Sequence, residues 1–273
     1  MKSNLGFRIN YKGSLVYLTI PDFSRTGLVK HCFTTRRGGV SEGRYSSLNT
    51  SPFKTDSLSN VNKNLDIVCS NIGIDYRKLI MTKQIHGDAI KVIDDENIGE
   101  KLNNNVMEGF DAMITNKTGI PLITFYADCV PIYILDPVNR AIGLVHSGWR
   151  STVLHIGAKT LRKMKDLYGS KPEECLIAIG PSIEKDCFEV GEDAAEAFRQ
   201  SFKDCSNIMF SKGNGKCNID LWECNKEMFI DEGVKPQNMT ISGLCTKCNE
   251  ELFFSHRRDK GNTGSLSAIM ELI

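Results

Sequence analysis

The sequence lacks the long apolar runs that mark secreted and membrane proteins. Its first residues, MKSNLGFRINYKGS, contain no continuous apolar stretch after the lysine. No later run reaches the roughly 18 apolar residues that a membrane span needs. We therefore expect no secretory signal peptide, no membrane partner and a cytoplasmic location.

The sequence also lacks an excess of either charge. It has 34 Lys and Arg against 33 Asp and Glu, which argues against the basic face of a nucleic-acid binder. The hydrophobic fraction of 41% is that of an ordinary globular protein with a sizeable core. A small-molecule partner is the expectation that remains.

Repeats, low-complexity segments and long linkers rich in Pro or Ser are missing as well. We therefore predict one compact domain over residues 1–273. Ten cysteines in a chain of this length do not form the dense disulfide framework of a small secreted scaffold. In a reducing compartment they serve as thiols, ligands or nucleophiles. No pattern indicates an oligomeric state.

Apolar residues at helical spacing predict several helices. One lies between Leu58 and Gly73, where Gly73 is placed to end it. A long helix follows Trp149 and ends at Gly169. Its apolar face consists of Leu154, Ala158, Leu161, Met164 and Tyr168. Shorter helices are expected near Ala194–Phe202 and Leu221–Ile230.

Short apolar stretches predict strands that are mostly buried on both faces. Several strands come in series before one helix instead of alternating strictly with helices, which favours a mixed β-sheet core with helices packed on it. The expected fold class is α/β, with α+β as the alternative. The predicted strands are Ile90–Ile93, Asp111–Ile114, Pro121–Tyr126, Ile132–Leu135, Ala141–Val145, Leu176–Ile179 and Ser267–Leu272.

Three chemically able side chains stand at the ends of these strands. His86 precedes one strand, Cys129 interrupts another, and His146 links a strand to the long helix. Loops on a rigid sheet collect binding residues, so the three segments could converge. Two imidazoles and a thiolate suit zinc, and three protein ligands leave a fourth position open for water, as in catalytic zinc sites. The alternative is that both histidines are structural residues with ordinary hydrogen-bond partners and that the cysteine belongs to the core.

The same residues fit a metal-free alternative. Cys129 could be a nucleophile with His146 as its base, which is the arrangement of a cysteine hydrolase or deamidase. Such a dyad does not require His86, so His86→Ala discriminates between the two. A single copper ion also suits two His and one Cys, although no axial Met is evident.

A glycine-rich turn and several arginines are candidates for phosphate binding. Arg36 and Arg37 offer cationic donors, and Gly38 and Gly39 offer backbone N–H groups. Arg150, at the start of the long helix, could add to an anion site. A glycine turn with solvated arginines, and a surface salt bridge for Arg150, are the alternatives.

Several other polar residues stay ambiguous. Asp128 could orient a ligand histidine, act as an acid or base, or cap a turn. Cys245 and Cys248 have the spacing of half a structural zinc site, but no second C-x-x-C follows. His31 and His155 are interpreted as structural, His155 lying within the long helix, whereas His256 has no clear assignment.

Six segments in order over nearly the whole chain resemble the YfiH-like family, also called the laccase-domain or polyphenol oxidase family. They are TTRRGGVS (34–41), QIHG (84–87), ADCVP (127–131), VHSGWR (145–150), IGPSI (179–183) and FSHRRD (254–259). Each motif is weak alone, and together they are specific. The family's fold resembles that of bacterial toxin deamidases of the CNF type, so the resemblance implies a CNF/YfiH-like fold.

The resemblance implies a zinc-dependent purine nucleoside phosphorylase acting on adenosine, inosine, guanosine and methylthioadenosine, with adenosine deaminase activity. Its partners would be a purine nucleoside and phosphate. The implied zinc ligands are His86, Cys129 and His146. The resemblance favours phosphate binding by the 36–39 turn. The family often continues as T-G-R where this chain has Ser265, which leaves any role of that arginine unassigned.

Two further functions compete with the phosphorylase. Copper-dependent phenol oxidation is the activity in the family's older name, but a multicopper oxidase needs many histidines in H-x-H pairs. This chain has five histidines and no such pair. A nucleotide-sensing or partner-binding protein could keep the pocket without turnover. The sequence decides neither the preferred nucleoside nor whether phosphorolysis or deamination matters in the cell.

Overall fold

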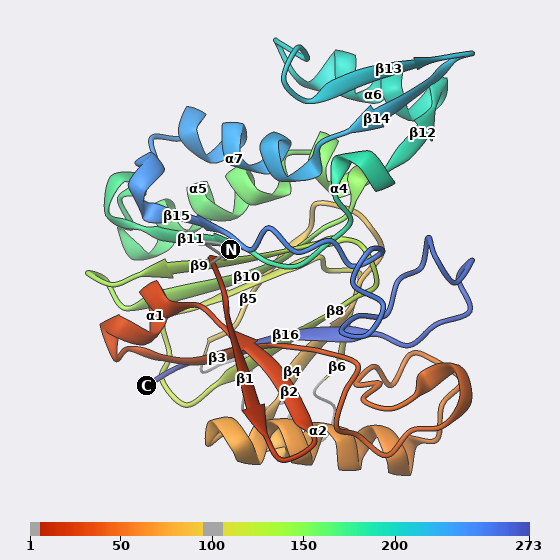
Figure 1. The fold of residues 1–273 in the computed structure, drawn as a ribbon. Coiled ribbons are helices and arrows are strands. Elements are labelled where there is room, and N and C mark those ends of the chain that lie inside the picture. Colours follow the sequence, from red (N-terminus) through yellow and green to blue (C-terminus); the bar gives the residue numbers. More distant parts are fainter. Residues whose placement is uncertain (1–5, 95–105) are drawn as a thin grey trace.

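The computed structural model describes residues 6–94 and 106–273 and shows two large β-sheets stacked face to face. Helix α2 (Leu58–Ile72) covers the outer face of one sheet, and helices α5 (Ile156–Tyr168) and α7 (Leu221–Asp231) cover the other (Figure 1). The result is four layers, in the order helix, sheet, sheet, helix. The predicted mixed α/β class is confirmed. The core, however, lies between two large sheets instead of consisting of the single sheet that we predicted.

The first sheet has seven described strands and is mostly antiparallel, with parallel pairing of β4 to both of its neighbours. A strand from late in the chain, β16, lies between β3 and β8 and pairs antiparallel with both. In spatial order the strands are β1 (Arg8–Lys12), β2 (Leu15–Thr19), β3 (Val29–Thr34), β16 (Leu266–Leu272), β8 (Pro121–Tyr126), β4 (Ile80–Lys83) and β6 (Val106–Glu108).

The second sheet has six described strands, and its centre is the antiparallel pair of β9 and β10. Every residue of these two strands is buried, because the other sheet covers one face and helices cover the other. In spatial order the strands are β15 (Met239–Ile241), β11 (Leu176–Ile179), β9 (Val130–Asp136), β10 (Ala141–Ser147), β7 (Ala112–Thr115) and β5 (Ile90–Val92).

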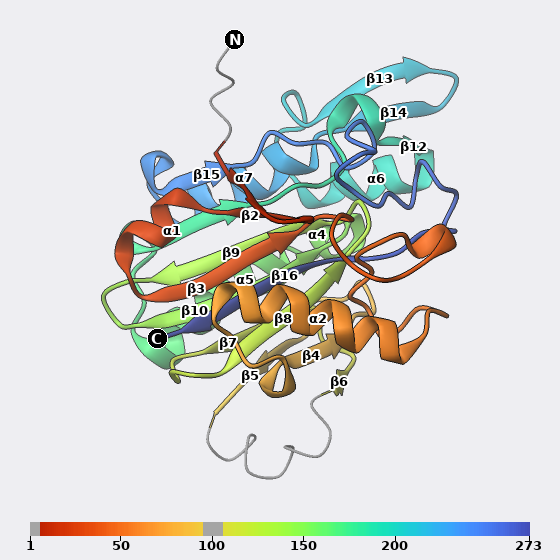
Figure 2. The same cartoon turned by 60° about the horizontal axis from the view of Figure 1, so that its bottom comes forward.

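A smaller unit projects beside the second sheet (Figures 1 and 2). It contains α6 (Glu192–Ser201) and a three-stranded antiparallel sheet. The strands are β12 (Glu189–Gly191), β14 (Lys216–Ile219) and β13 (Met209–Gly213). Short helix α1 (Pro21–Thr26) joins β2 to β3 in the first sheet. Within residues 6–94 and 106–273, no helix has the length and apolar character needed to cross a membrane.

Three apolar clusters join the layers. Phe33, Tyr133 and Leu144 belong to the cluster between the sheets. Leu65 and Val68 of α2 pack on the outer face of the first sheet, and Leu161 and Met164 of α5 pack on the second. Gly73 ends α2 in the left-handed conformation, with φ of 72°, as the sequence predicts.

The predicted long helix after Trp149 is two helices. Helix α4 (Trp149–Val153) stops after five residues, and α5 starts after His155, which has φ of 57°. The ring of His155 contacts Ser201, with 2.7 Å between Nε2 and Oγ. The expectation that His155 lies within a helix is therefore wrong, and Leu154 is 40% exposed instead of lining the apolar face. A side-chain contact with the end of α6 accompanies this break.

His31 is buried in β3 and is expected to make the fold sensitive to acid. Its Nε2 accepts a hydrogen bond from the Ile20 N–H at 2.8 Å, and burial lowers its pKa from 6.5 to about 4. The unfolded chain takes up this proton near pH 6.5 but the folded chain only near pH 4. Stability from this group is therefore complete above about pH 6.5 and is lost as the pH falls toward 4.

We expect His31→Gln, which stays neutral, to lose less stability on acidification. Between pH 7.5 and 4.5, its unfolding free energy should fall by about 2–3 kcal/mol less than that of the wild type. Urea denaturation at both pH values measures this difference. Equal losses in the two proteins would show that His31 does not govern the acid response.

Candidate metal centre and its pocket

His86 lies in the loop after β4, in a turn that a buried carboxylate holds. The backbone has φ of 62° at His86, a conformation that costs a non-glycine residue roughly 1–2 kcal/mol. Asp111, fully buried just before β7, accepts hydrogen bonds from the N–H groups of Ile85, His86 and Gly87 at 3.2, 3.0 and 2.8 Å. These three bonds compensate for the strain and fix the direction of the His86 side chain.

Asp111 also holds the second histidine. His146 is near the end of β10, is 3% exposed, and donates from Nδ1 to Asp111 Oδ1 at 2.7 Å. The Nε2 lone pair is then left for a metal ion, the arrangement in which a carboxylate fixes the tautomer of a ligand histidine. Sequence reasoning missed Asp111. Its only signal is a carboxylate immediately before an apolar strand.

Cys129 completes the group from the loop between β8 and β9. Because β9 and β10 pair antiparallel, with Pro131 opposite His146, the start of one strand lies beside the end of the other. The three candidate ligand atoms of Cys129, His86 and His146 all lie within 4.8 Å of one another. The structure thus brings together the three residues that the sequence indicates.

The spacing of these atoms fits a tetrahedral ion. Cys129 Sγ is 3.7 Å from His86 Nε2, and a tetrahedral zinc with bonds of about 2.3 Å to sulfur and 2.05 Å to nitrogen places the two about 3.6 Å apart. The ring centres of His86 and His146 are 4.9 Å apart, and the ring planes are inclined by 80°. The donor set of two His and one Cys suits zinc and also copper.

The charges within the group favour a thiolate at neutral pH. Burial alone would raise the pKa of Cys129, but His146 and His86 lower it to about 6. Burial likewise opposes the charge on His146, whereas Cys129 and Asp111 raise its pKa to about 9. Without a bound cation, Cys129 and His146 therefore form a thiolate and imidazolium pair. A thiolate is the form of cysteine that binds metals and that attacks carbonyl groups.

Gly148 allows the close approach of the three segments. A Cβ at this position would lie 2.7 Å from His86 Cδ2 and 3.2 Å from Cys129 Sγ.

We expect Gly148→Ala to displace the His86 ring and to lower metal affinity at least tenfold, because misplaced ligands lose most of their coordination energy. Metal titration of the purified variant measures this. Gly191→Ala, where an added Cβ meets nothing within 4 Å, is the control, and equal affinity in both variants would contradict the prediction.

Two of the three candidate ligands, His86 and Cys129, line a pocket of about 550 Å³. One part of its wall is apolar and comes from Trp149, Ile183, Phe188, Val190 and Leu221. Another part carries Arg150, His256 and Arg257. The Arg257 guanidinium lies 5.2 Å from the Phe188 ring centre and donates to the Glu189 carbonyl at 2.9 Å. The pocket thus combines apolar residues, two arginines and two of the candidate metal ligands.

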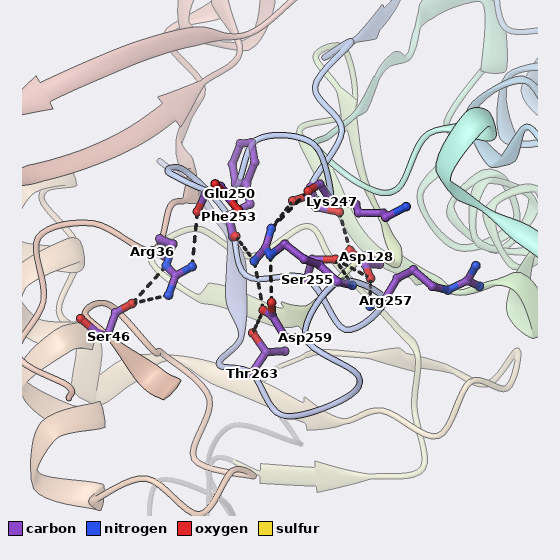
Figure 3. A network of polar contacts seen from close by, with 12 residues as sticks. Arg36, Ser46, Asp128, Lys247, Glu250, Phe253, Ser255, Arg257, Asp259 and Thr263 are labelled. Carbon is purple, nitrogen blue, oxygen red and sulfur yellow. Dashed lines mark hydrogen bonds and ion pairs between the residues drawn. The ribbon is translucent and has the colours of Figure 1, made fainter. Parts of the chain in front are cut away.

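Asp128 is buried beside this pocket and holds a loop. Its carboxylate accepts hydrogen bonds from Thr246 Oγ1 at 2.6 Å, Ser255 Oγ at 3.0 Å and the Arg257 N–H at 2.6 Å (Figure 3). The carboxylate that orients a ligand histidine is therefore Asp111. Of the roles considered for Asp128, the geometry favours fastening the segment around residues 246–257.

The 36–39 turn lies outside the pocket that contains the candidate metal ligands. Arg36 donates to the carbonyls of Ser46 and Glu250 (Figure 3), and together with Arg37 it lines a different cavity. The N–H groups of Gly38 and Gly39 both donate to Ser47 Oγ, at 3.1 and 3.2 Å. These contacts use the groups on which the prediction of a phosphate site there depends.

Arg150 lines the pocket, but the argument for it changes. It belongs to α4, whose five residues are too few for the long-helix terminus that the sequence suggests. Its guanidinium lies 4.3 Å from the Trp149 ring centre. Arg257, which sequence reasoning left within a family motif without a role, borders the same pocket.

The chain is similar to known proteins over most of its length. The family model described as multi-copper polyphenol oxidoreductase laccase matches residues 30–273. A protein of Bacteroides thetaiotaomicron named purine nucleoside phosphorylase is 34% identical, covering 95% of this chain and 96% of its own length. A protein from an unknown prokaryote named adenosine deaminase RL5 is 32% identical, over 89% and 94% of the two chains. The crystal structure of YlmD from Geobacillus stearothermophilus is 28% identical and superposes with a TM-score of 0.91, over 98% and 99% of the chains.

Proposed function

The chain belongs to the multi-copper polyphenol oxidoreductase laccase family, and we propose that it is a zinc-dependent purine nucleoside phosphorylase that also deaminates adenosine. The proposed zinc ligands are His86, Cys129 and His146. The observation that carries the proposal is the placement of these three ligand atoms within 4.8 Å of one another, two of them from residues that line a pocket with aromatic and arginine side chains. The names of relatives with similar chain lengths support the choice of substrate.

A zinc ion bound at this position would supply Lewis acidity and an activated water molecule. The chain itself contributes the orientation of both histidines through Asp111, which is their common hydrogen-bond partner. It also supplies a site whose cysteine is already ionised near neutral pH, since His146 and His86 lower the pKa of Cys129 to about 6 against the effect of burial.

The lining of the pocket offers groups that suit both members of the substrate pair. Trp149 and Phe188 offer aromatic surface to a purine, and purines stack on such rings. Arg150 and Arg257 offer guanidinium groups, which bind phosphate through paired N–H donors. We place the phosphate near these two arginines, in preference to the 36–39 turn, because the N–H groups of Gly38 and Gly39 are bonded to Ser47.

The direct test is nucleoside turnover by the purified protein with its bound metal quantified. We expect adenine and ribose 1-phosphate from adenosine in phosphate buffer, inosine in phosphate-free buffer, and zinc bound by the active protein. Arg150→Ala and Arg257→Ala should raise the phosphate concentration that gives half-maximal rate. Arg37→Ala, in the separate cavity, is the control. Zinc-loaded protein that leaves adenosine, inosine, guanosine and methylthioadenosine all unchanged would refute the proposal.

One observation favours a second candidate function. The thiolate and imidazolium pair of Cys129 and His146, oriented by Asp111, is the arrangement of a cysteine hydrolase. That reading leaves His86 without a catalytic role, so the behaviour of His86 variants separates the two functions. The older oxidase name of the family has less support, because His31 is buried against Ile20 and His155 contacts Ser201. Neither is placed to complete a multicopper cluster.

A further inference from the structure

A second group of candidate ligands lies outside the site described above. Cys245 and Cys248, which the sequence presents as half a metal site, come together with Cys187 and Glu184. The four ligand atoms all lie within 4.8 Å of one another. Cys187 Sγ is 3.3 Å from Cys248 Sγ, and Glu184 Oε1 is 3.9 Å from the same sulfur. The missing half of the site is thus an E-x-x-C segment from much earlier in the chain.

Backbone pairing brings the two halves into register. Ser182 and Cys245 form a parallel bridge between the two segments. The Ser182 N–H donates to the Leu244 carbonyl at 3.2 Å, and the Thr246 N–H donates to the Ser182 carbonyl at 3.0 Å. Because these bonds lie directly beside the ligands, the positions of Cys245 and Glu184 follow from the main chain and not only from side-chain rotamers.

The separations fit one tetrahedral ion. Two sulfurs bound to a tetrahedral zinc at about 2.3 Å lie about 3.8 Å apart, and a sulfur and a carboxylate oxygen lie about 3.5 Å apart. The Sγ–Sγ distance of 3.3 Å and the Oε1–Sγ distance of 3.9 Å are each close to these values. We propose that Glu184, Cys187, Cys245 and Cys248 form a second, structural metal site that binds zinc or another thiophilic divalent cation. Four protein ligands leave no open position, which is the pattern of structural and not of catalytic zinc.

The composition of the group agrees with a cation. It combines one carboxylate with three cysteines, and Cys245 is 2% exposed. Metal binding uses cysteines as thiolates, and a divalent cation compensates for the negative charge that these thiolates and Glu184 bring together.

A disulfide between Cys187 and Cys248 is the competing explanation of their proximity. It would leave Cys245, which is 2% exposed, and Glu184 without a role in the cluster. A metal ion uses all four groups at once. The proposal rests on this geometry alone and does not depend on the nucleoside chemistry of the other site.

The second site would fasten two walls of the pocket. Cys187 immediately precedes Phe188, which lines the pocket. On the other segment, Thr246 lies between Cys245 and Cys248 and donates to Asp128. Arg258 donates to the carbonyls of Thr246 and Lys247, at 3.2 and 3.3 Å. A cation bound here therefore joins the Phe188 wall to the loop that carries Arg257.

The experiment uses cobalt as a spectroscopic probe in reduced, metal-free protein. Cys129→Ser removes the thiolate of the first site, so any thiolate-to-cobalt charge-transfer band in this variant comes from another cysteine. We expect one cobalt ion per chain with an intense near-ultraviolet band and the visible bands of a tetrahedral ion. Adding Cys187→Ser and Cys248→Ser to this variant should abolish the near-ultraviolet and the visible bands. Adding Cys205→Ser instead, at a partly buried cysteine outside the cluster, should leave these bands unchanged.

Thermal unfolding gives a second measurement on the same variants. Zinc at about 1,000 times its dissociation constant should raise the melting temperature of Cys129→Ser by about 10 °C. The variant that also lacks Cys187 and Cys248 should show no such shift. The proposal fails if Cys129→Ser binds no cobalt, or if its spectrum survives the loss of both cysteines. It also fails if mass spectrometry shows the freshly purified protein lacking two hydrogens at Cys187 and Cys248, which would identify a disulfide.

Discussion

Replacing His86 by glycine is expected to lower nucleoside turnover by about 10³-fold or more. A bound metal stabilises the transition state by several kcal/mol, and each 1.4 kcal/mol changes the rate about tenfold. The same change should leave the fold intact. His86 has φ of 62°, a conformation that glycine adopts freely, so the metal-free variant should be more stable than metal-free wild type by about 1 kcal/mol. Metal analysis, kinetics and urea denaturation measure the three effects.

His86→Gly also separates the two candidate functions. The side chain is exposed, so its removal leaves a space into which imidazole from solution can enter. Recovery of both metal and activity with added imidazole would support the metal site. Ile85→Ala, at the exposed neighbouring position, is the control and should keep full activity. A His86→Gly protein that keeps most of its activity without metal would instead identify the Cys129 and His146 dyad as the catalytic unit.

Replacing Asp111 by asparagine should weaken both the metal site and the fold. One carboxylate oxygen accepts from the N–H groups of Ile85 and Gly87, and the other accepts from the His86 N–H and the His146 ring. Asparagine keeps one accepting oxygen, so its amide nitrogen leaves one of these two pairs of donors without an acceptor. Loss of such a carboxylate partner typically costs 10–100-fold in metal affinity. Unpaired buried donors should lower the unfolding free energy by roughly 2–4 kcal/mol. Zinc titration and urea denaturation measure the two effects.

Asp128→Asn is the matched comparison for Asp111→Asn. Asp128 is also a buried aspartate, and it accepts three hydrogen bonds, from Thr246, Ser255 and Arg257. We expect a similar loss of stability with a much smaller loss of zinc affinity at the His86 site. If the two variants lose zinc affinity equally, the effect of Asp111 is a general one on folding and not a specific one on His146.

The sequence predicts the elements whose signals are local. Helix α2 and its end at Gly73 follow from apolar spacing and one glycine, and strands β8 and β11 match their predicted bounds. The break at His155 and the division into two sheets depend on contacts between distant segments. His155 contacts Ser201 at the end of α6, and no pattern within residues 149–168 encodes that contact.

The candidate sites show the same division. His86, Cys129 and His146 could be selected because each is a chemically distinctive residue at the end of an apolar stretch. Asp111 could not, because an aspartate before a strand is common and its role arises only when β7 and the His86 loop meet. Likewise, Cys245 and Cys248 carry a recognisable spacing, whereas Glu184 and Cys187 join them only through the pairing of Ser182 with Cys245.

The position of β16 has a consequence for how the protein folds during synthesis. This strand lies between β3 and β8 and pairs with both, yet Leu266 follows the end of β8 by 140 positions. At ribosomal rates of about 5–20 residues per second, β8 waits about 7–28 seconds for its partner. During that interval β3 and β8 each expose an unpaired apolar edge, which is a template for association with other chains. Contacts of such long sequence separation also slow folding itself, so the nascent chain is expected to depend on chaperones that cover these edges until β16 is made.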